Sequence, residues 1–151
     1  MDLEEPPATD LNGPAASGTA PESRSPFWRS HGTLLVVDDD PAVREVVTSL
    51  LERCGLTVLI AADGHSALEI FHRRADEIRL VFLDLTLPDT DGETVFHSMR
   101  KIRPHLLAIL CSGCLTDEAV DQRLRAGWAA VIRKPFRLIP FLQTVRTVLE
   151  G

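Results

Sequence analysis

Short runs of apolar residues alternate with longer amphipathic stretches from residue 33 to the end of the chain. The apolar runs predict five strands, at residues 34–37, 57–61, 80–83, 106–110 and 130–132. Each run is continuously apolar instead of apolar at every second position, so we expect both faces of the sheet to be covered. Such strands are typical of a parallel sheet.

The amphipathic stretches predict one helix after each strand. The first helix has Asp40 as N-cap, Pro41 at its first position and Gly55 directly after its end. The other four helices are predicted at residues 66–75, 93–101, 117–126 and 140–149. Because right-handed crossovers join such βα units, the sequence predicts an α/β flavodoxin-like three-layer sandwich with a parallel five-stranded sheet of order 2-1-3-4-5.

Residues 1–30 differ from the rest of the chain. They contain five of the ten prolines, mixed with Ala, Ser, Gly and Thr, and show neither a helical nor a strand period. A segment of this composition buries too little apolar surface to offset its ordering entropy. We therefore expect a disordered N-terminal tail or linker at 1–30 and one domain at 31–151. Phe27 and Trp28 are interpreted as leading into the domain, with a docking motif as the alternative.

The composition narrows the class of protein. With 151 residues, 44% of them hydrophobic, the chain can bury one core. The formal net charge is -6 and no basic patch stands out, which argues against direct nucleic-acid binding. The apolar runs are far shorter than a membrane span, and three cysteines without a disulfide framework fit a reducing compartment. We expect a cytoplasmic protein without membrane insertion.

Polar residues capable of chemistry follow four of the predicted strands. Asp38 and Asp39 follow the first strand, Asp84 the third, Ser112 the fourth and Lys134 the fifth. In an open parallel sheet the ligand site lies at the carboxyl ends of the strands, where the strand order reverses. These five side chains are therefore expected to lie together.

Carboxylates in such a cluster need a compensating positive charge. Two of them about 4 Å apart repel by about 4 kcal/mol at an effective dielectric constant of about 20. A bound cation with oxygen ligands relieves this repulsion, and Mg²⁺ or Mn²⁺ suits such ligands better than Zn²⁺. A metal beside a carboxylate, a hydroxyl and an ammonium is also the set of groups that phosphoryl transfer requires. Asp84 would then be the nucleophile that forms an aspartyl phosphate.

Four motifs carry a family resemblance: LLVVDDDPAVR, VFLDLTLPDTDG, LCSG and VIRKPF. In this order they resemble the receiver domain of two-component response regulators, over residues 33–150. The resemblance implies a phosphorelay signalling domain and not an enzyme, although such a domain assists its own phosphorylation and dephosphorylation.

The resemblance also assigns a phosphoacceptor and a metal site. It implies that Asp84 accepts a phosphoryl group from the phosphohistidine of a histidine kinase or a histidine phosphotransfer protein. The ligands of Mg²⁺, or of Mn²⁺, would be Asp38, Asp39, Asp84 and the backbone carbonyl of Thr86.

The resemblance implies a conformational switch as well. Ser112 would hydrogen-bond the phosphoryl group, and Lys134 would point its ammonium inward from a cis peptide bond. The family usually has Tyr or Phe three residues before this lysine, whereas this chain has Val131. Because valine is stiff at χ1 and has no ring, the aromatic half of the switch is expected to be missing. Trp128 is interpreted as a packing residue.

The output of such a domain would be a protein contact. The chain ends just after the last predicted helix, so we expect a downstream protein target or a phosphorylation-dependent homodimer. The resemblance favours the fourth helix, the fifth strand and the fifth helix as the contact surface. A stand-alone receiver and a receiver related to those of hybrid histidine kinases both remain open, and Met1 with the N-terminal segment favours the first.

Three other functions fit parts of the sequence. Cys111 and Cys114 in C-S-G-C resemble a redox pair, although Cys111 is expected at the buried end of a strand. A phosphohydrolase of the haloacid dehalogenase type also uses Asp, Lys and Mg²⁺, but its nucleophile follows the first strand and Asp84 follows the third. A receiver-like binding module that works without phosphorylation would keep its partner affinity in an Asp84→Ala variant.

Overall fold

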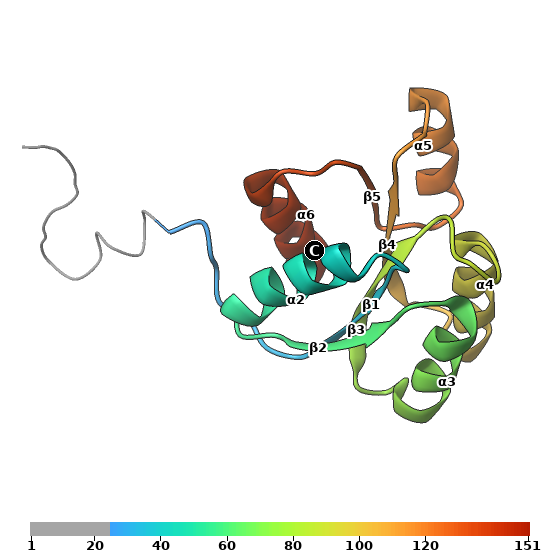
Figure 1. Cartoon of the computed structure of the whole chain (residues 1–151), viewed down its shortest axis with the longest axis horizontal. Coiled ribbons are helices and arrows are strands. Elements are labelled where there is room, and N and C mark those ends of the chain that lie inside the picture. The colour runs from blue at the N-terminus through green and yellow to red at the C-terminus, as the bar shows by residue number, and fades with distance from the viewer. Residues whose placement is uncertain (1–24) are drawn as a thin grey trace, which may run out of the picture.

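The computed structural model describes residues 25–151, which form a parallel sheet between two layers of helices (Figure 1). The strand order is β2-β1-β3-β4-β5. The strands are β1 (Thr33–Val37), β2 (Thr57–Ala61), β3 (Ile78–Asp84), β4 (Leu107–Ser112) and β5 (Ala130–Arg133). The helices are α2 (Pro41–Arg53), α3 (Gly64–Arg74), α4 (Gly92–Ile102), α5 (Asp117–Arg125) and α6 (Leu138–Glu150).

The helices cover both faces of the sheet and create two buried clusters. α2 and α6 pack over one face, and α3 and α4 pack over the other (Figure 1). Along β1, Leu34 and Val36 belong to one cluster while Leu35 and Val37 belong to the other, which explains the continuous apolar run. The predicted flavodoxin-like fold and its strand order are confirmed. No helix within residues 25–151 is long and apolar enough to cross a membrane.

Two strands extend past their predicted ends to include candidate site residues. β3 includes Asp84 and β4 includes Ser112, because strand pairing continues past the last apolar residue. Asp84 pairs with Cys111, and Ser112 pairs with Arg133. The side chains of Asp84 and Ser112 therefore start from rigid strand positions and not from the loops that follow.

The last helix also begins earlier than predicted. α6 starts at Leu138, so Pro140 lies inside its first turn. The amide groups of a first turn have no partner within the helix, so a proline there removes no helical hydrogen bond.

The segment before β1 lies against α2 and α6. Trp28 donates a hydrogen bond from Nε1 to the Leu142 carbonyl in α6 at 2.9 Å. The Arg53 guanidinium at the end of α2 lies 3.9 Å from the centre of the Phe27 ring. These contacts agree with the interpretation that Phe27 and Trp28 lead into the domain. The rest of the predicted tail, residues 1–24, lies outside the described residues.

Candidate metal and phosphoacceptor site

The carboxyl ends of β1 and β3 bring three aspartates together. Asp38 and Asp39 follow β1, and Asp84 is the last residue of β3. One carboxylate oxygen from each lies within 4.8 Å of the other two. Asp38 is fully buried and Asp84 is 7% exposed, whereas Asp39 is exposed. The cluster therefore combines two enclosed carboxylates with one that faces solvent.

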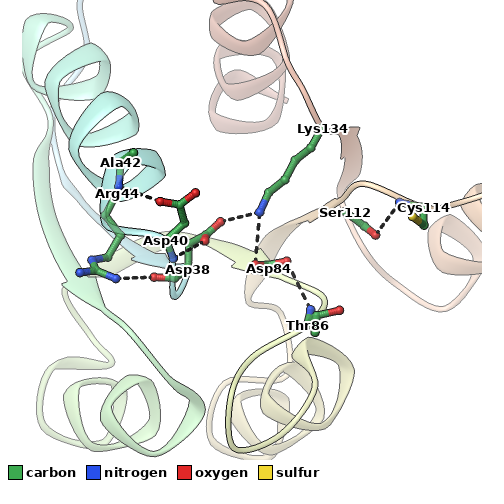
Figure 2. A network of polar contacts seen from close by, with 9 residues as sticks. All are labelled: Asp38, Asp40, Ala42, Arg44, Asp84, Thr86, Ser112, Cys114 and Lys134. Atoms are coloured by element: carbon green, nitrogen blue, oxygen red, sulfur yellow. Dashed lines mark hydrogen bonds and ion pairs between the residues drawn. The ribbon is translucent and has the colours of Figure 1, made fainter.

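Asp38 is held in place by three hydrogen bonds (Figure 2). Its Oδ1 accepts from the Asp40 amide at 2.9 Å, and its Oδ2 accepts from Lys134 Nζ at 2.9 Å. The Arg44 guanidinium, in the first turn of α2, donates to the Asp38 carbonyl at 2.8 Å. Asp40 is the N-cap of α2, as predicted, and accepts from the Ala42 amide. The sequence alone does not predict a role for Arg44. The one feature of the sequence that points to this contact is the position of Arg44 in the first turn of the helix that follows Asp38.

The ammonium of Lys134 lies between two of the aspartates. Its Nζ donates to Asp38 at 2.9 Å and to Asp84 at 3.2 Å (Figure 2). It reaches them from the end of β5, and its peptide bond to Pro135 is cis, as the resemblance implied. Burial alone would lower the pKa of Lys134, but the hydrogen bonds and charges of the two aspartates outweigh burial and raise this pKa. Lys134 is therefore a fixed positive charge at neutral pH.

The surroundings of Asp84 disfavour the ionised form of its carboxyl group. Burial is the main cause that raises its pKa, and the charge of Asp38 adds to it. Lys134 and a hydrogen bond from the Thr86 amide, at 3.3 Å, act in the opposite direction. One ammonium thus faces three carboxylates, and their excess negative charge favours a bound cation. The donors are all oxygen atoms, which suits Mg²⁺ or Mn²⁺.

Ser112 and Thr86 are both drawn to the right of Asp84 in Figure 2, with Ser112 above Thr86. The Ser112 hydroxyl, at the end of β4, accepts a hydrogen bond from the Cys114 amide at 3.3 Å. Thr86 lies in the loop between β3 and α4. This loop returns so closely to the strand that a Cβ on Gly92 would lie 2.3 Å from the Asp84 carbonyl oxygen. Glycine at this position is therefore required for the loop to stay near the site.

Val131 lines an open pocket between β5 and α5. A cavity of about 260 Å³ lies there, lined by Asp117, Val120, Asp121, Val131 and Arg133. Trp128 is buried elsewhere and packs on Phe96, with 4.1 Å between the ring centroids. Trp128 is therefore a packing residue, as interpreted from the sequence, and does not replace the missing aromatic ring.

The two cysteines of C-S-G-C do not form a reactive pair. Cys111 is buried, and burial raises the pKa of its thiol to about 12. Cys114 is exposed, and both thiols are free. Because the thiolate is the reactive form of cysteine, a thiol with this pKa is inert at neutral pH. The geometry gives the redox interpretation no support.

Fold and site together define a class of protein: a doubly wound α/β domain with an acidic cluster and a lysine at the switch point of its sheet. A family model described as the response regulator receiver domain matches residues 34–146. The chain belongs to this family, the receiver domains of two-component signal transduction, whose members are phosphoacceptors.

Individual relatives agree with this assignment. The chain is 32% identical over 143 residues to the sensor kinase CckA of Brucella abortus, a match that covers 95% of this chain and 13% of CckA. It is 34% identical over 121 residues to the probable transcriptional regulatory protein TcrX of Mycobacterium tuberculosis, covering 78% of this chain and 50% of TcrX. The chain thus spans half or less of these two relatives.

A solved structure shares both fold and sequence features with the chain. The CheX-CheY-BeF3-Mg²⁺ complex from Borrelia burgdorferi contains a chain that is 27% identical, with a TM-score of 0.70. The match covers 78% of this chain and 88% of that one.

Proposed function

We propose that this chain accepts a phosphoryl group on Asp84 from the phosphohistidine of a histidine kinase or a histidine phosphotransfer protein, in a step that needs Mg²⁺. The observation that carries the proposal is the setting of Asp84. It ends the central strand β3, lies beside Asp38 and bonds to Lys134 at 3.2 Å. A carboxylate between a metal cluster and a fixed ammonium is well placed to attack a phosphorus atom.

The metal would be held by the side chains of Asp38, Asp39 and Asp84 and by the backbone carbonyl of Thr86. The clustered carboxylates and the raised pKa of Asp84 support this assignment, because a divalent cation relieves their repulsion. When bound, the ion supplies positive charge that neutralises the phosphoryl oxygens. Mn²⁺ prefers similar ligands and could replace Mg²⁺. The CheX-CheY complex from Borrelia burgdorferi includes Mg²⁺, which supports the same choice of ion.

The residues of the chain would carry out the transfer itself. A carboxylate oxygen of Asp84 attacks phosphorus, and a P–O bond forms as the P–N bond to the donor histidine breaks. The imidazole leaves with the electron pair of that P–N bond. Lys134 would pair with a phosphoryl oxygen, and Ser112 would turn away from the Cys114 amide to donate to another. The same groups would assist the later hydrolysis of the acyl phosphate by water, so the domain would promote its own dephosphorylation.

The phosphorylated domain would signal through contacts with a downstream protein or with a second phosphorylated copy. We place this contact on α5, β5 and α6. The structure describes all nine residues of α5, and none of them is buried. Few core contacts therefore oppose a shift of this helix. Because the proposed phosphodonors act inside the cell, we also propose that the protein is cytoplasmic.

Incubation of the full chain with acetyl phosphate and Mg²⁺ tests the proposal. Intact-mass measurement should show one added phosphoryl group on the wild type. Asp84→Ala and a metal-free sample are the controls, and neither should gain mass. An adduct that persists in Asp84→Ala would place the acceptor elsewhere. No adduct on the wild type would favour a binding module that works without phosphorylation.

A further inference from the structure

The loop between β3 and α4 forms a small hairpin next to Asp84. Thr86 and Asp91 pair across it in an antiparallel bridge. Nearer the tip, the Leu87 amide donates to the Thr90 carbonyl at 3.1 Å. The tip consists of Pro88 and Asp89, while the base carries the Thr86 carbonyl. Any group that holds the tip therefore also restrains the backbone at Thr86.

The Asp89 side chain holds the tip to a different helix. Its Oδ1 accepts from the Gly64 amide at 2.9 Å, and its Oδ2 accepts from the His65 amide at 3.0 Å. Both amides belong to the first turn of α3. The N-cap of this helix, Asp63, accepts from the Ser66 amide at 2.7 Å. The start of α3 thus bonds to two carboxylates, one from its own segment and one from the phosphoacceptor loop.

The packing around Gly64 shows that this contact is close and specific. A Cβ on Gly64 would lie 2.4 Å from Cγ2 of Thr90, so only glycine allows the loop tip to approach α3 this closely. Gly64 is buried, and Asp89 satisfies its amide. The two amide hydrogen bonds lower the pKa of Asp89, because they stabilise its ionised carboxylate.

We propose that Asp89 is a positioning residue of the phosphoacceptor site. By bonding the first turn of α3 it fixes the hairpin, and through the hairpin the Thr86 carbonyl, where a metal ligand is needed. The inference rests on the proposed function for the metal, but the hydrogen bonds between Asp89 and the start of α3 do not depend on it. Outer groups that orient metal ligands commonly change metal affinity by about 10- to 100-fold when they are removed.

A matched pair of variants separates positioning from helix capping. Asp89→Ala and Asp63→Ala each remove one carboxylate from the start of α3, so both should lower the Tm by similar amounts, roughly 2–8 °C. Only Asp89→Ala releases the loop. Asp89→Asn keeps one acceptor oxygen for one of the two amides and should fall between Asp89→Ala and the wild type.

Two readouts follow the loop in the full chain. Without metal, amide hydrogen exchange at Leu87 should become roughly tenfold faster in Asp89→Ala and stay unchanged in Asp63→Ala. A Mg²⁺ titration followed by the Thr86 amide signal should give a Kd raised about tenfold in Asp89→Ala only.

The outcomes separate this inference from the proposed function. If the two variants shift the Leu87 exchange and the Mg²⁺ affinity equally, or not at all, Asp89 is only a helix cap and the inference is wrong. If the Leu87 exchange responds as expected but the wild type binds no Mg²⁺, Asp89 does hold the loop to α3 and the metal assignment is wrong.

Discussion

At the scale of single residues, Asp84 contributes to the pH dependence of the stability of the metal-free fold. Burial and the neighbouring Asp38 raise its pKa, so the folded protein holds a proton on Asp84 more tightly than the unfolded chain does. The contribution of this group to stability is therefore most favourable below its ordinary pKa of 3.8 and falls as the pH rises through the raised pKa. At neutral pH the ionised Asp84 destabilises the fold.

Asp84→Asn removes this charge with little change in shape. Without metal at neutral pH, the Tm of the variant should be roughly 2–5 °C above that of the wild type. This difference in Tm should decrease as the pH falls toward about 4. Mg²⁺ should raise the Tm of the wild type but not that of the variant. Calorimetry across this pH range measures both effects. A metal-free variant that melts below the wild type at neutral pH would show that the ion pair with Lys134 outweighs the repulsion.

Part of the site can be predicted from the sequence because sheet geometry alone assembles it. Asp38, Asp84 and Lys134 stand at strand ends, and the strand order brings strand ends together. Arg44 and Asp89 cannot be predicted in this way. Each bonds to a backbone group whose position depends on the path of a loop, and residue type and spacing do not reveal that path.

At the scale of elements, α6 depends on packing more than on its own cap. Within the described structure, its N-cap residue Arg137 makes no side-chain hydrogen bond to the helix. Its buried side chains are Phe141, Leu142 and Val145. Trp28 adds a hydrogen bond to the Leu142 carbonyl from the segment before β1. This segment should therefore stabilise α6.

Trp28→Ala should destabilise the domain although Trp28 takes no part in the proposed site. We expect a loss of about 2 kcal/mol in the free energy of unfolding, from the lost ring contacts and the lost hydrogen bond. Trp28→Phe is the matched control: it keeps a ring but no N–H, and should lose about 1 kcal/mol. Urea unfolding measures both values. A Trp28→Ala variant as stable as the wild type would show that the Trp28 side chain does not stabilise the domain.

Element type can be predicted from this sequence more securely than element ends. Each strand has an apolar run and each helix has an apolar face. These patterns extend over several residues, so they do not depend on the exact ends of the element. The ends depend on partners from elsewhere in the chain. α3 begins at Gly64 and not at Ser66, because Asp89 satisfies two amides of its first turn from a distant loop.

At the scale of the whole molecule, the proposed site and the proposed output surface are linked through α4. This helix begins at Gly92, directly after the loop that leaves Asp84. Its Glu93 pairs with Arg123 of α5 at 2.7 Å. A movement of the loop can therefore reach α5 although Val131 supplies no aromatic ring.

In the proposed function, Asp84 carries the phosphoryl group. The most direct measurement treats the full chain with acetyl phosphate and Mg²⁺, reduces the product with sodium borohydride and locates the modified residue by peptide mass spectrometry. Borohydride converts an acyl phosphate to an alcohol, so an aspartyl phosphate becomes homoserine. Homoserine is expected at position 84 alone. Homoserine at Asp38 or Asp39 instead, or its absence from the phosphorylated chain, would contradict the assignment.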